Sequence, residues 1–299
     1  MRKFVVYSVL TGGYDNIIQP LVVDDRFDYI LYTDNVTSLS KGVWSVRKIP
    51  YEHWDKTRQS RYPKMHPNML LAEYCASLYI DANIQIVDKT IYDRFIELYY
   101  RGVDWSSFKH SYRDCIYDEA YVAYGLDTEE NILRWCHRLR KESYPRHYGL
   151  YENGLIYRIH NEKTLSINNQ WWELYDHYTR RDQLTLCYVL WKDSEINIEY
   201  FLGGESIWNT TTLHIYKHHI NSNNIGGRIV RKSFLEHFRN RCRIGIEEKI
   251  ICFKEFHYWL YKHPLFISKM LLYIWGWYAL IVYGLTIKYR TVKKHKNET

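Results

Sequence analysis

Alternating apolar and polar positions, rich in β-branched residues, predict four strands in the first part of the chain. These are residues 3–10, 27–34, 43–50 and 77–86. The first strand ends at a Thr-Gly-Gly turn, and the last carries Asp81 and Asn83 within an otherwise apolar run. A buried charge is costly unless it has a partner or a function, so Asp81 is the first candidate for chemistry.

Helical spacing predicts the elements that connect and follow these strands. Apolar residues recur at this spacing over residues 68–78, after a basic loop over residues 55–67. Helices are also expected over residues 90–102, 118–145 (with a break around Gly125) and 169–192, and a strand over residues 151–161. Strands separated by helices predict an α/β fold with a mostly parallel central sheet flanked by helices.

Ligands of such sheets bind beyond the carboxyl ends of the strands. Three short polar clusters, residues 11–15, 33–34 and 81–83, follow or end predicted strands. We therefore expect these clusters to line one rim of the sheet.

The chain is expected to have three parts. They are an α/β domain over residues 1–227, a helical extension over residues 228–264, and an apolar segment with a polybasic tail over residues 265–299. Residues 270–287 carry no formal charge, and basic residues follow them directly. This length is borderline for a membrane span, which needs about 20 residues. Insertion into an anionic membrane surface and packing as a buried terminal helix are the alternatives to a span.

Composition indicates a globular, cytoplasmic protein, with 46% hydrophobic residues and no signal sequence at its start. The six cysteines lack paired or metal-ligand spacing, which is typical of buried, reduced thiols. The net charge of +7 comes largely from the tail, so association with the cytoplasmic face of the membrane is expected. The basic residues form no continuous stripe, which argues against a nucleic-acid partner.

The Asp81-Ala82-Asn83 tripeptide offers two hard oxygen ligands at the end of a strand. Mn²⁺ or Mg²⁺ bridging two phosphates requires such ligands, whereas a turn-capping carboxylate is the simpler interpretation of Asp81. Three cations stand three residues apart just upstream and can donate to a diphosphate, or form a solvated surface. They are Arg58, Arg61 and Lys64.

Seven segments occur in an order that resembles a known family. They are "YSVLTGGYDNI", "YILYTDN", "R..RYPKMHP", "SLYIDANIQI", "KHSYRDCIYDEA", "ENGLIYRIHN" and "RRDQLTLCYVLWK". Together, over roughly residues 3–220, they resemble a glycosyltransferase-like domain, formerly of unknown function, found in bacterial polysaccharide loci and in plant mucilage (pectin) galacturonosyltransferases. More distantly, the chain is similar to retaining, glycogenin-like enzymes of the GT-A fold.

The resemblance implies a GT-A fold, a nucleotide-sugar donor (a UDP-sugar), a divalent cation, and a glycan or lipid-linked acceptor. The implied nucleotide-binding residues are Thr11, Gly12, Tyr14 and Asp34, beside the three cations above. The implied metal ligands are Asp81, Asn83 and a histidine, for which His219 is preferred over His218 and His214. Catalysis is implied for Asp182 and Gln183, although Asp182 can also be a helix N-cap.

Four further residues are expected near the donor sugar or the acceptor. They are His110, Arg113, Asn153 and Arg181. His110 and Arg113 lie in the segment that is densest in polar residues, where ordinary helix-capping roles are the alternative. The function that follows is transfer of a hexose or uronic acid, with retention, onto a polysaccharide or lipid-linked glycan. A non-catalytic carbohydrate- or nucleotide-binding module, and a nucleic-acid binder with stacking aromatics, are the competing hypotheses.

Overall fold

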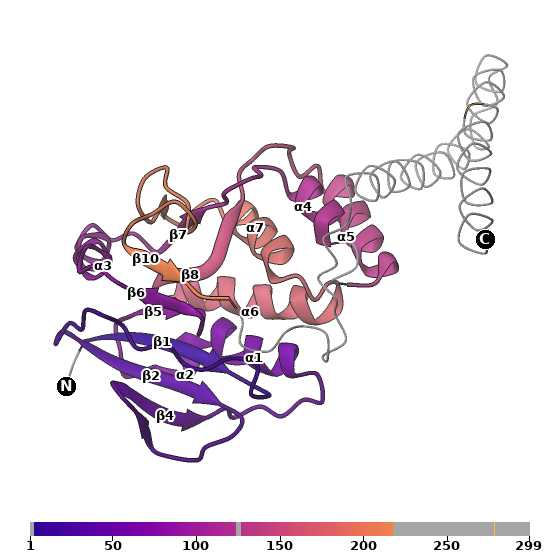
Figure 1. The fold of residues 1–299 in the computed structure, drawn as a ribbon. Helices are drawn as coiled ribbons and strands as arrows, with labels where there is room; N and C mark the ends of the chain where they lie inside the picture. The colour runs from indigo at the N-terminus through magenta and orange to yellow at the C-terminus, as the bar shows by residue number, and fades with distance from the viewer. Residues whose placement is uncertain (1–2, 124–126, 218–277, 279–299) are drawn as a thin grey trace, which may run out of the picture. The chain divides into compact units, whose positions relative to one another are not determined.

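A computed structural model describes residues 3–123, 127–217 and 278 of the chain (Figure 1). All of them except Tyr278 belong to one unit, Met1–Ile229. The predicted helical extension and the apolar segment lie outside the described residues, Tyr278 apart, so the predicted division into three parts stays a prediction. Among the described residues, no helix combines the length and the apolar character that crossing a membrane requires.

An eight-stranded sheet forms the centre of this unit, in the order β3-β4-β2-β1-β5-β8-β7-β9. The strands are β1 Phe4–Leu10, β2 Phe27–Thr33, β3 Ser40–Lys41, β4 Trp44–Lys48, β5 Ala76–Ile80, β7 Trp105–Lys109, β8 Tyr151–Ile159 and β9 Ile198–Tyr200. Only β3 and β8 run antiparallel to their neighbours. The predicted α/β fold with a mostly parallel sheet is therefore confirmed.

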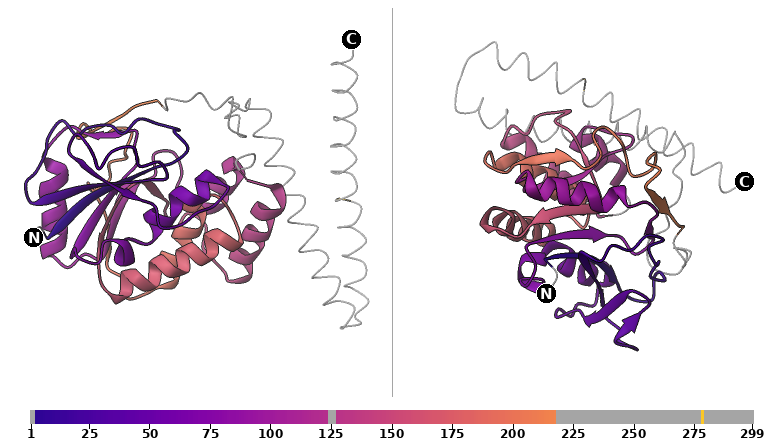
Figure 2. Two further views of the ribbon diagram at one scale, coloured as in Figure 1. Left: turned by 90° about the horizontal axis from the view of Figure 1, so that it is seen from below. Right: turned by 90° about the vertical axis from the view of Figure 1, so that its left-hand side faces the viewer.

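Helices cover both faces of the sheet (Figures 1 and 2). They are α1 Lys56–Met65, α2 Pro67–Leu70, α3 Thr90–Tyr100, α4 Ile116–Ala123, α5 Glu129–Lys141, α6 Glu162–His177 and α7 Asp182–Lys192. One face packs against α1 and α4 to α7. The other packs against α3 and a small two-stranded sheet of β6 Ile84–Ile86 and β10 Leu213–Ile215.

The two-residue period of β1 explains how it serves both faces. Val5, Tyr7 and Val9 belong to the core beneath α1 and α4 to α7, whereas Phe4 and Val6 belong to the core beneath α3. Burial on both faces is typical of a parallel sheet, and it makes the strand's sequence almost continuously apolar.

The segment between β4 and β5 differs from its prediction. The expected basic loop over residues 55–67 is mostly helix α1, which is N-capped by Asp55 through a hydrogen bond from the Thr57 N–H. The helix predicted over residues 68–78 is wrong, because α2 ends at Leu70 and Leu78 lies in β5. An apolar run of this length fits a helix and a buried strand equally well.

Other predictions need smaller corrections. The fourth predicted strand is two strands, β5 and β6, separated by a turn at Asp81–Asn83. The single helical region predicted over residues 169–192 is divided between α6 and α7, with residues 178–181 outside both helices. Strand β7 was not predicted. Cys75 is an exposed thiol, although Cys115, Cys136 and Cys187 are buried as expected. Cys242 and Cys252 lie outside the described residues.

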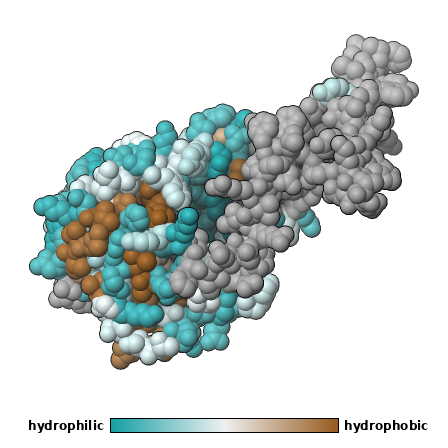
Figure 3. Space-filling view, viewed as in Figure 1, coloured by the Kyte–Doolittle hydropathy of each residue, from teal (hydrophilic) through white to brown (hydrophobic). Residues whose placement is uncertain are grey.

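The surface seen from the direction of Figure 1 mixes hydrophilic and hydrophobic areas (Figure 3). Two of the exposed hydrophobic residues, Leu21 and Val23, lie in the connection between β1 and β2. The Leu21 N–H donates to the Ile86 carbonyl, which holds this connection against the small sheet. This connection follows the Thr11–Tyr14 turn that forms part of the candidate site.

Candidate active site

The carboxyl ends of β1 and β2 form a joined pair of turns. The Gly12 N–H donates to both carboxylate oxygens of Asp34, at 3.1 and 3.2 Å. Thr11 Oγ1 donates to the Lys56 carbonyl, and Lys56 Nζ lies 2.9 Å from Asp34. Gly12 has a φ of +61°, which favours glycine here. Tyr14 belongs to the same turn, since its N–H donates to the Thr11 carbonyl.

Asp81 lies directly beyond the carboxyl end of β5, with its side chain 38% exposed. Its Oδ1 accepts a hydrogen bond from the Tyr79 hydroxyl at 2.6 Å and lies 3.8 Å from Lys64 Nζ. Its N–H donates to the Gly154 carbonyl of β8. A Cβ at Gly154 would lie 3.4 Å from Asp81 Oδ2 and 3.0 Å from two isoleucine methyl groups, so this approach depends on glycine.

Asn83 is tied to the end of β10. Its Nδ2 donates to the Tyr216 carbonyl at 2.9 Å, and the Tyr216 N–H donates back to the Asn83 carbonyl. His214 of β10 is exposed, and its ring packs edge-on against Tyr216. His218 and the preferred ligand His219 lie outside the described residues, so the choice among the three histidines stays open.

Asp182 is the first residue of α7 and is only 3% exposed. Its Oδ2 lies 2.9 Å from Lys64 Nζ and 3.2 Å from Arg61 Nε. Burial alone would raise the pKa of this carboxyl, but the charges of Lys64, Arg61 and Arg181 outweigh that effect and hold its pKa well below the ordinary range. Asp182 is therefore a carboxylate at neutral pH. We call Arg61, Lys64, Asp81 and Asp182 the Asp182 cluster.

The three upstream cations do not share one environment, although they are spaced three residues apart on α1. Arg58 pairs with Asp176 of α6, whereas Arg61 and Lys64 meet Asp182. Lys64 is 1% exposed, so its ammonium is a buried partner of two carboxylates and not a surface charge. The structure thus separates Arg58 from the two other predicted diphosphate contacts.

Two buried amides have polar atoms that find no hydrogen-bond partner among the described residues. They are both polar atoms of Asn153, which is 4% exposed, and Oε1 of Gln183, also 4% exposed. Gln183 Nε2 donates to the Tyr151 carbonyl at 3.1 Å and lies 3.4 Å from Glu152 Oε2, so both amides border the start of β8. Buried polar groups are nearly always paired, so these amide atoms are candidates for contacts with a ligand or a water molecule.

A second buried carboxylate, Glu119 of α4, is wholly inaccessible to solvent. Its Oε2 accepts from Arg113 Nε at 2.7 Å, and its Oε1 accepts from the Arg181 guanidinium at 2.9 Å. Arg181 is the N-cap residue of α7 and immediately precedes Asp182. Glu119 therefore joins two predicted sugar contacts to the start of the helix that carries the predicted catalytic pair.

His110 lies beside this carboxylate and is 6% exposed. Burial lowers its pKa against the opposing influence of Glu152 and Glu119. Its Nδ1 accepts hydrogen bonds from the N–H groups of Tyr112 and Arg113, which places the proton on Nε2. Nε2 lies 3.6 Å from Glu119 and 3.9 Å from Glu152. The imidazole is neutral and directed at two carboxylates.

Sequence reasoning did not select Glu119 or Glu152. Glu152 Oε1 accepts from the N–H and the hydroxyl of Ser111, and Oε2 faces Gln183. Glu152 immediately precedes the Asn153-Gly154 pair that the sequence did single out. This neighbouring position is the one sequence feature that could have identified Glu152 as a site residue. No local pattern distinguishes Glu119 from an ordinary helical glutamate. We call His110, Arg113, Glu119, Glu152 and Arg181 the Glu119 cluster.

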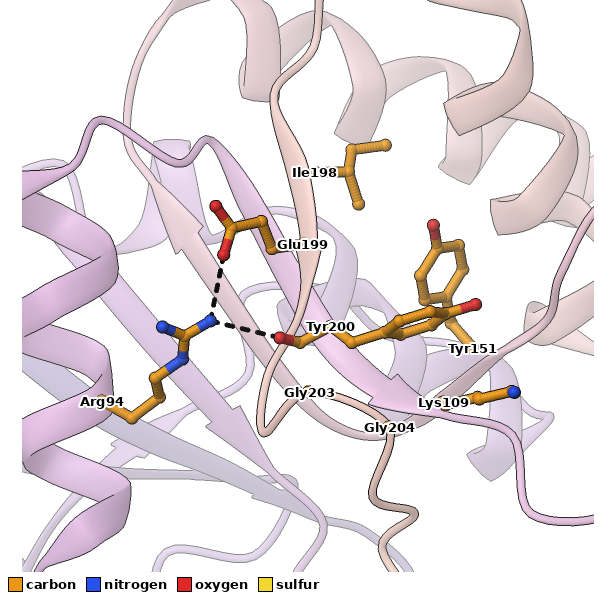
Figure 4. A pocket seen from close by; sticks show the side chains of 8 residues that line it. All are labelled: Arg94, Lys109, Tyr151, Ile198, Glu199, Tyr200, Gly203 and Gly204. Atoms are coloured by element: carbon orange, nitrogen blue, oxygen red, sulfur yellow. Dashed lines mark hydrogen bonds and ion pairs between the residues drawn. The ribbon is translucent and has the colours of Figure 1, made fainter.

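A surface pocket of about 550 Å³ lies around the edge strand β9 (Figure 4). Arg94 and Glu199 meet on one side of the strand, and the Tyr151 and Tyr200 rings lie on the other, with centroids 5.5 Å apart. None of the predicted site residues lines this pocket. The Tyr151 backbone carbonyl accepts from Gln183, so the pocket adjoins the start of α7, but no member of either cluster lines it.

The oxygen donors at the end of β5 fit a hard divalent cation. Asp81 contributes a partly exposed carboxylate, and the amide nitrogen of Asn83 is turned to Tyr216, which leaves its Oδ1 as the other donor. Mg²⁺ and Mn²⁺ prefer such oxygen ligands and are normally completed by water and phosphate oxygens. The neighbouring Lys64 ammonium forms an ion pair with Asp182, with Nζ 2.9 Å from Oδ2.

The solved structures that are similar to this chain include the following two. An apo structure of WbbM, a bifunctional glycosyltransferase, matches 67% of this chain with 10% identity and a TM-score of 0.43. The chain spans only 38% of that structure. Core-mannan synthase A (CmsA/Ktr4) from Aspergillus fumigatus, in its Mn/GDP form, matches 67% of this chain and 73% of its own length, with 10% identity and a TM-score of 0.42.

At these TM-scores and identities, the activity of neither protein transfers to this chain. No family model and no curated protein matches the sequence, so the family resemblance drawn from the sequence stays a prediction.

Proposed function

We propose that this protein is a metal-assisted glycosyltransferase. It transfers a hexose or uronic acid from a nucleotide sugar, a UDP-sugar, with retention of configuration. The acceptor is a polysaccharide or a lipid-linked glycan. The observation that carries the proposal is the convergence of three distant pieces of sequence, Asp81, Asn153-Gly154 and Asp182-Gln183. They meet around two buried amides whose polar atoms are not all paired within the described part of the chain.

The turns beyond β1 and β2 are the proposed nucleotide site. Thr11, Gly12, Tyr14 and Asp34 line them, and Gly12 leaves room for close approach of a ligand. Asp81 and Asn83 would hold Mn²⁺ or Mg²⁺, with His219 as the proposed third ligand. The bound cation would neutralise charge on the diphosphate. Arg61, whose side chain is 24% exposed, would add to that neutralisation, and the buried Lys64 would add to it from its place between Asp81 and Asp182.

The sugar would lie against the unpaired amides at the start of β8. Asn153 can donate and accept toward sugar hydroxyls, which supports its proposed role as a donor contact. Gln183 Oε1 is free to face a positively polarised anomeric carbon. Asp182, held between Lys64 and Arg61, fixes the start of α7 and thereby the position of Gln183.

A UDP-release assay across a panel of UDP-sugars, with and without Mn²⁺, tests the proposal. We expect release from one or a few donors that increases with Mn²⁺ and is lost in Asp81→Ala. Asp93→Ala serves as the matched control, because Asp93 is an exposed carboxylate on α3 paired with Arg26. UDP binding without release from any donor would instead support a non-catalytic binding module.

Attachment to the cytoplasmic membrane surface through residues 265–299 is a separate proposal that rests on the sequence. Removing residues 270–299 should abolish sedimentation with anionic vesicles and leave UDP release intact, because every proposed site residue precedes that segment. Loss of activity with aggregation would indicate a buried terminal helix.

A further inference from the structure

A cysteine, an aspartate and a histidine meet at the start of α4. Cys115 immediately precedes the helix and is 0% exposed, Asp118 lies in its first turn, and His147 lies in the connection between α5 and β8. The thiol, a carboxylate oxygen and a ring nitrogen of these residues all lie within 4.8 Å of one another. The sequence separates Cys115 from His147 widely, so no ligand spacing was visible in it.

A second observation concerns how the histidine is held. Asp114 Oδ1 lies 2.7 Å from His147 Nδ1, which is the carboxylate-to-imidazole contact that orients histidines as metal ligands. The Gly149 N–H also donates to the Asp114 carbonyl at 2.9 Å, so the two loops are joined by their backbones. The His147 side chain is 61% exposed, which leaves the cluster open to solvent.

We propose that Cys115, Asp118 and His147 form a Zn²⁺ site, with Asp114 as the residue that orients His147. A thiolate, an imidazole and a carboxylate are the ligand types that select zinc, and three protein ligands leave a fourth position for water. Zinc binds such atoms at about 2.0 to 2.3 Å in a tetrahedron, which places them roughly 3.5 Å apart. The ligand atoms, now within 4.8 Å of one another, would move closer together when the ion binds.

The ion would act as a clamp between two loops that lead into the Glu119 cluster. One loop carries His110 and Arg113, and the other leads to Glu152 at the start of β8. The ligand set contains a thiolate, whereas the proposed ligands at the Asp81 site are two oxygens and an imidazole, so the two metal sites have different preferences. This proposal does not depend on sugar transfer and can be tested without a substrate.

Titration of the chelator-treated full chain with Co²⁺ alone tests the thiolate ligand. We expect one tightly bound ion per chain with a thiolate-to-cobalt charge-transfer band in the near ultraviolet. Cys115→Ser should abolish the band, whereas Cys75→Ser, which changes an exposed free cysteine, and Asp81→Ala should keep it. A band that is absent from the wild type, or that persists in Cys115→Ser, overturns the proposal.

Zn²⁺ affinities provide the second test and avoid a buried substitution. His147→Gln changes an exposed side chain, so the fold should survive while stoichiometric Zn²⁺ binding is lost. Asp114→Asn should weaken binding by about 10- to 100-fold, as expected for a residue that orients a ligand. Zn²⁺ should raise the melting temperature of the wild type and not that of His147→Gln. Equal Zn²⁺ affinity in the wild type and His147→Gln contradicts the site.

Discussion

The Asp182 and Glu119 clusters each hold a buried carboxylate next to two cationic side chains, in different parts of the fold. In each, a carboxylate at most 3% exposed is held by two cations: Asp182 by Lys64 and Arg61, and Glu119 by Arg113 and Arg181. The Asp182 cluster includes Asp81, which is partly exposed to solvent, whereas the Glu119 cluster includes the buried, neutral His110. We propose that the first cluster meets a ligand and that the second fixes the position of the elements around it.

The largest expected effect is on stability, in Glu119→Gln. Removing this charge leaves Arg113 and Arg181, whose side chains are 26% and 32% exposed, without their carboxylate. The cost should therefore lie between about 1 kcal/mol for a surface pair and about 3 to 5 kcal/mol for a fully buried pair. Urea unfolding followed by circular dichroism measures the loss. Glu97→Gln is the control, since Glu97 forms its ion pairs with Arg94 and Arg101 at the surface and should change little. Equal losses in both variants would mean that Glu119 does not hold its cluster together.

Gln183→Ala should have the largest effect on turnover. Its Oε1 is proposed to meet charge that develops only in the transition state, so kcat should fall by about 10²- to 10³-fold with little change in donor KM. Steady-state kinetics with the preferred donor measures this. Gln170→Ala, an exposed glutamine on α6, is the matched control. A change in KM alone would return the catalytic centre to His110 and Arg113.

Asn153→Ala should separate activity from stability. Neither polar atom of this buried amide is paired within residues 3–123 and 127–217, so these parts of the fold lose no hydrogen bond. The free energy of unfolding should therefore stay the same or rise by up to about 1 to 3 kcal/mol. Turnover should fall because the proposed sugar contact is gone. Thermal melts measure the stability of the variant, and UDP release by the same samples measures its turnover. A destabilised but fully active variant would show that Asn153 has only a structural role.

The pKa of Asp182 predicts the acid behaviour of its cluster. Because that pKa is held below the ordinary carboxyl value of about 3.9, the carboxylate stabilises the fold above this pH, and the contribution is lost as pH falls through the lower folded value. The stability difference between wild type and Asp182→Asn should therefore shrink below about pH 4. Urea titrations at several pH values measure it. A difference that is independent of pH would contradict the ion pair with Lys64.

The smallest effect is expected from Arg58→Ala. Arg58 pairs with Asp176, whose side chain is 38% exposed, so the loss of stability should be below about 1 kcal/mol. Donor affinity should fall more in Arg61→Ala than in Arg58→Ala, because only Arg61 adjoins Asp182. Calorimetric titration with UDP compares the two. Equal losses of affinity would mean that Arg58 leaves Asp176 to bind the diphosphate.

The elements that depend on interactions between residues close in the chain could be predicted from the sequence. The strands β1 and β2 and the turns that follow them were visible from β-branched runs, glycines and the strand-end Asp34. Helix α1 was missed because its sequence is basic and polar with Pro63 inside, so no apolar stripe indicated a helix. Residues 68–78 were misassigned because the wholly buried β5 has no alternation to separate it from a helix.

The candidate site divides in the same way. Asp81, Asp182 and Gln183 lie at element ends, where polar residues stand out against apolar runs. Glu119 does not stand out in this way, since its role depends on its pairing with Arg181, which is 62 residues away in the chain. Long-range pairs of this kind are set by tertiary packing and leave no local pattern. This also explains why the separate pairing of Arg58 could not be foreseen from an even spacing of three.

Metal-dependent UDP release by three proteins tests the central claim most directly, that Asp81 and Asn83 hold the cation at the sugar-transfer site. With the preferred donor and increasing Mn²⁺, the wild type should show saturable activation. Asn83→Asp should saturate at lower Mn²⁺, because it adds a charge to the ligand set, and Asp81→Ala should show no release at any concentration. Near-normal turnover of Asp81→Ala, together with an unchanged Mn²⁺ titration of Asn83→Asp, would contradict the account.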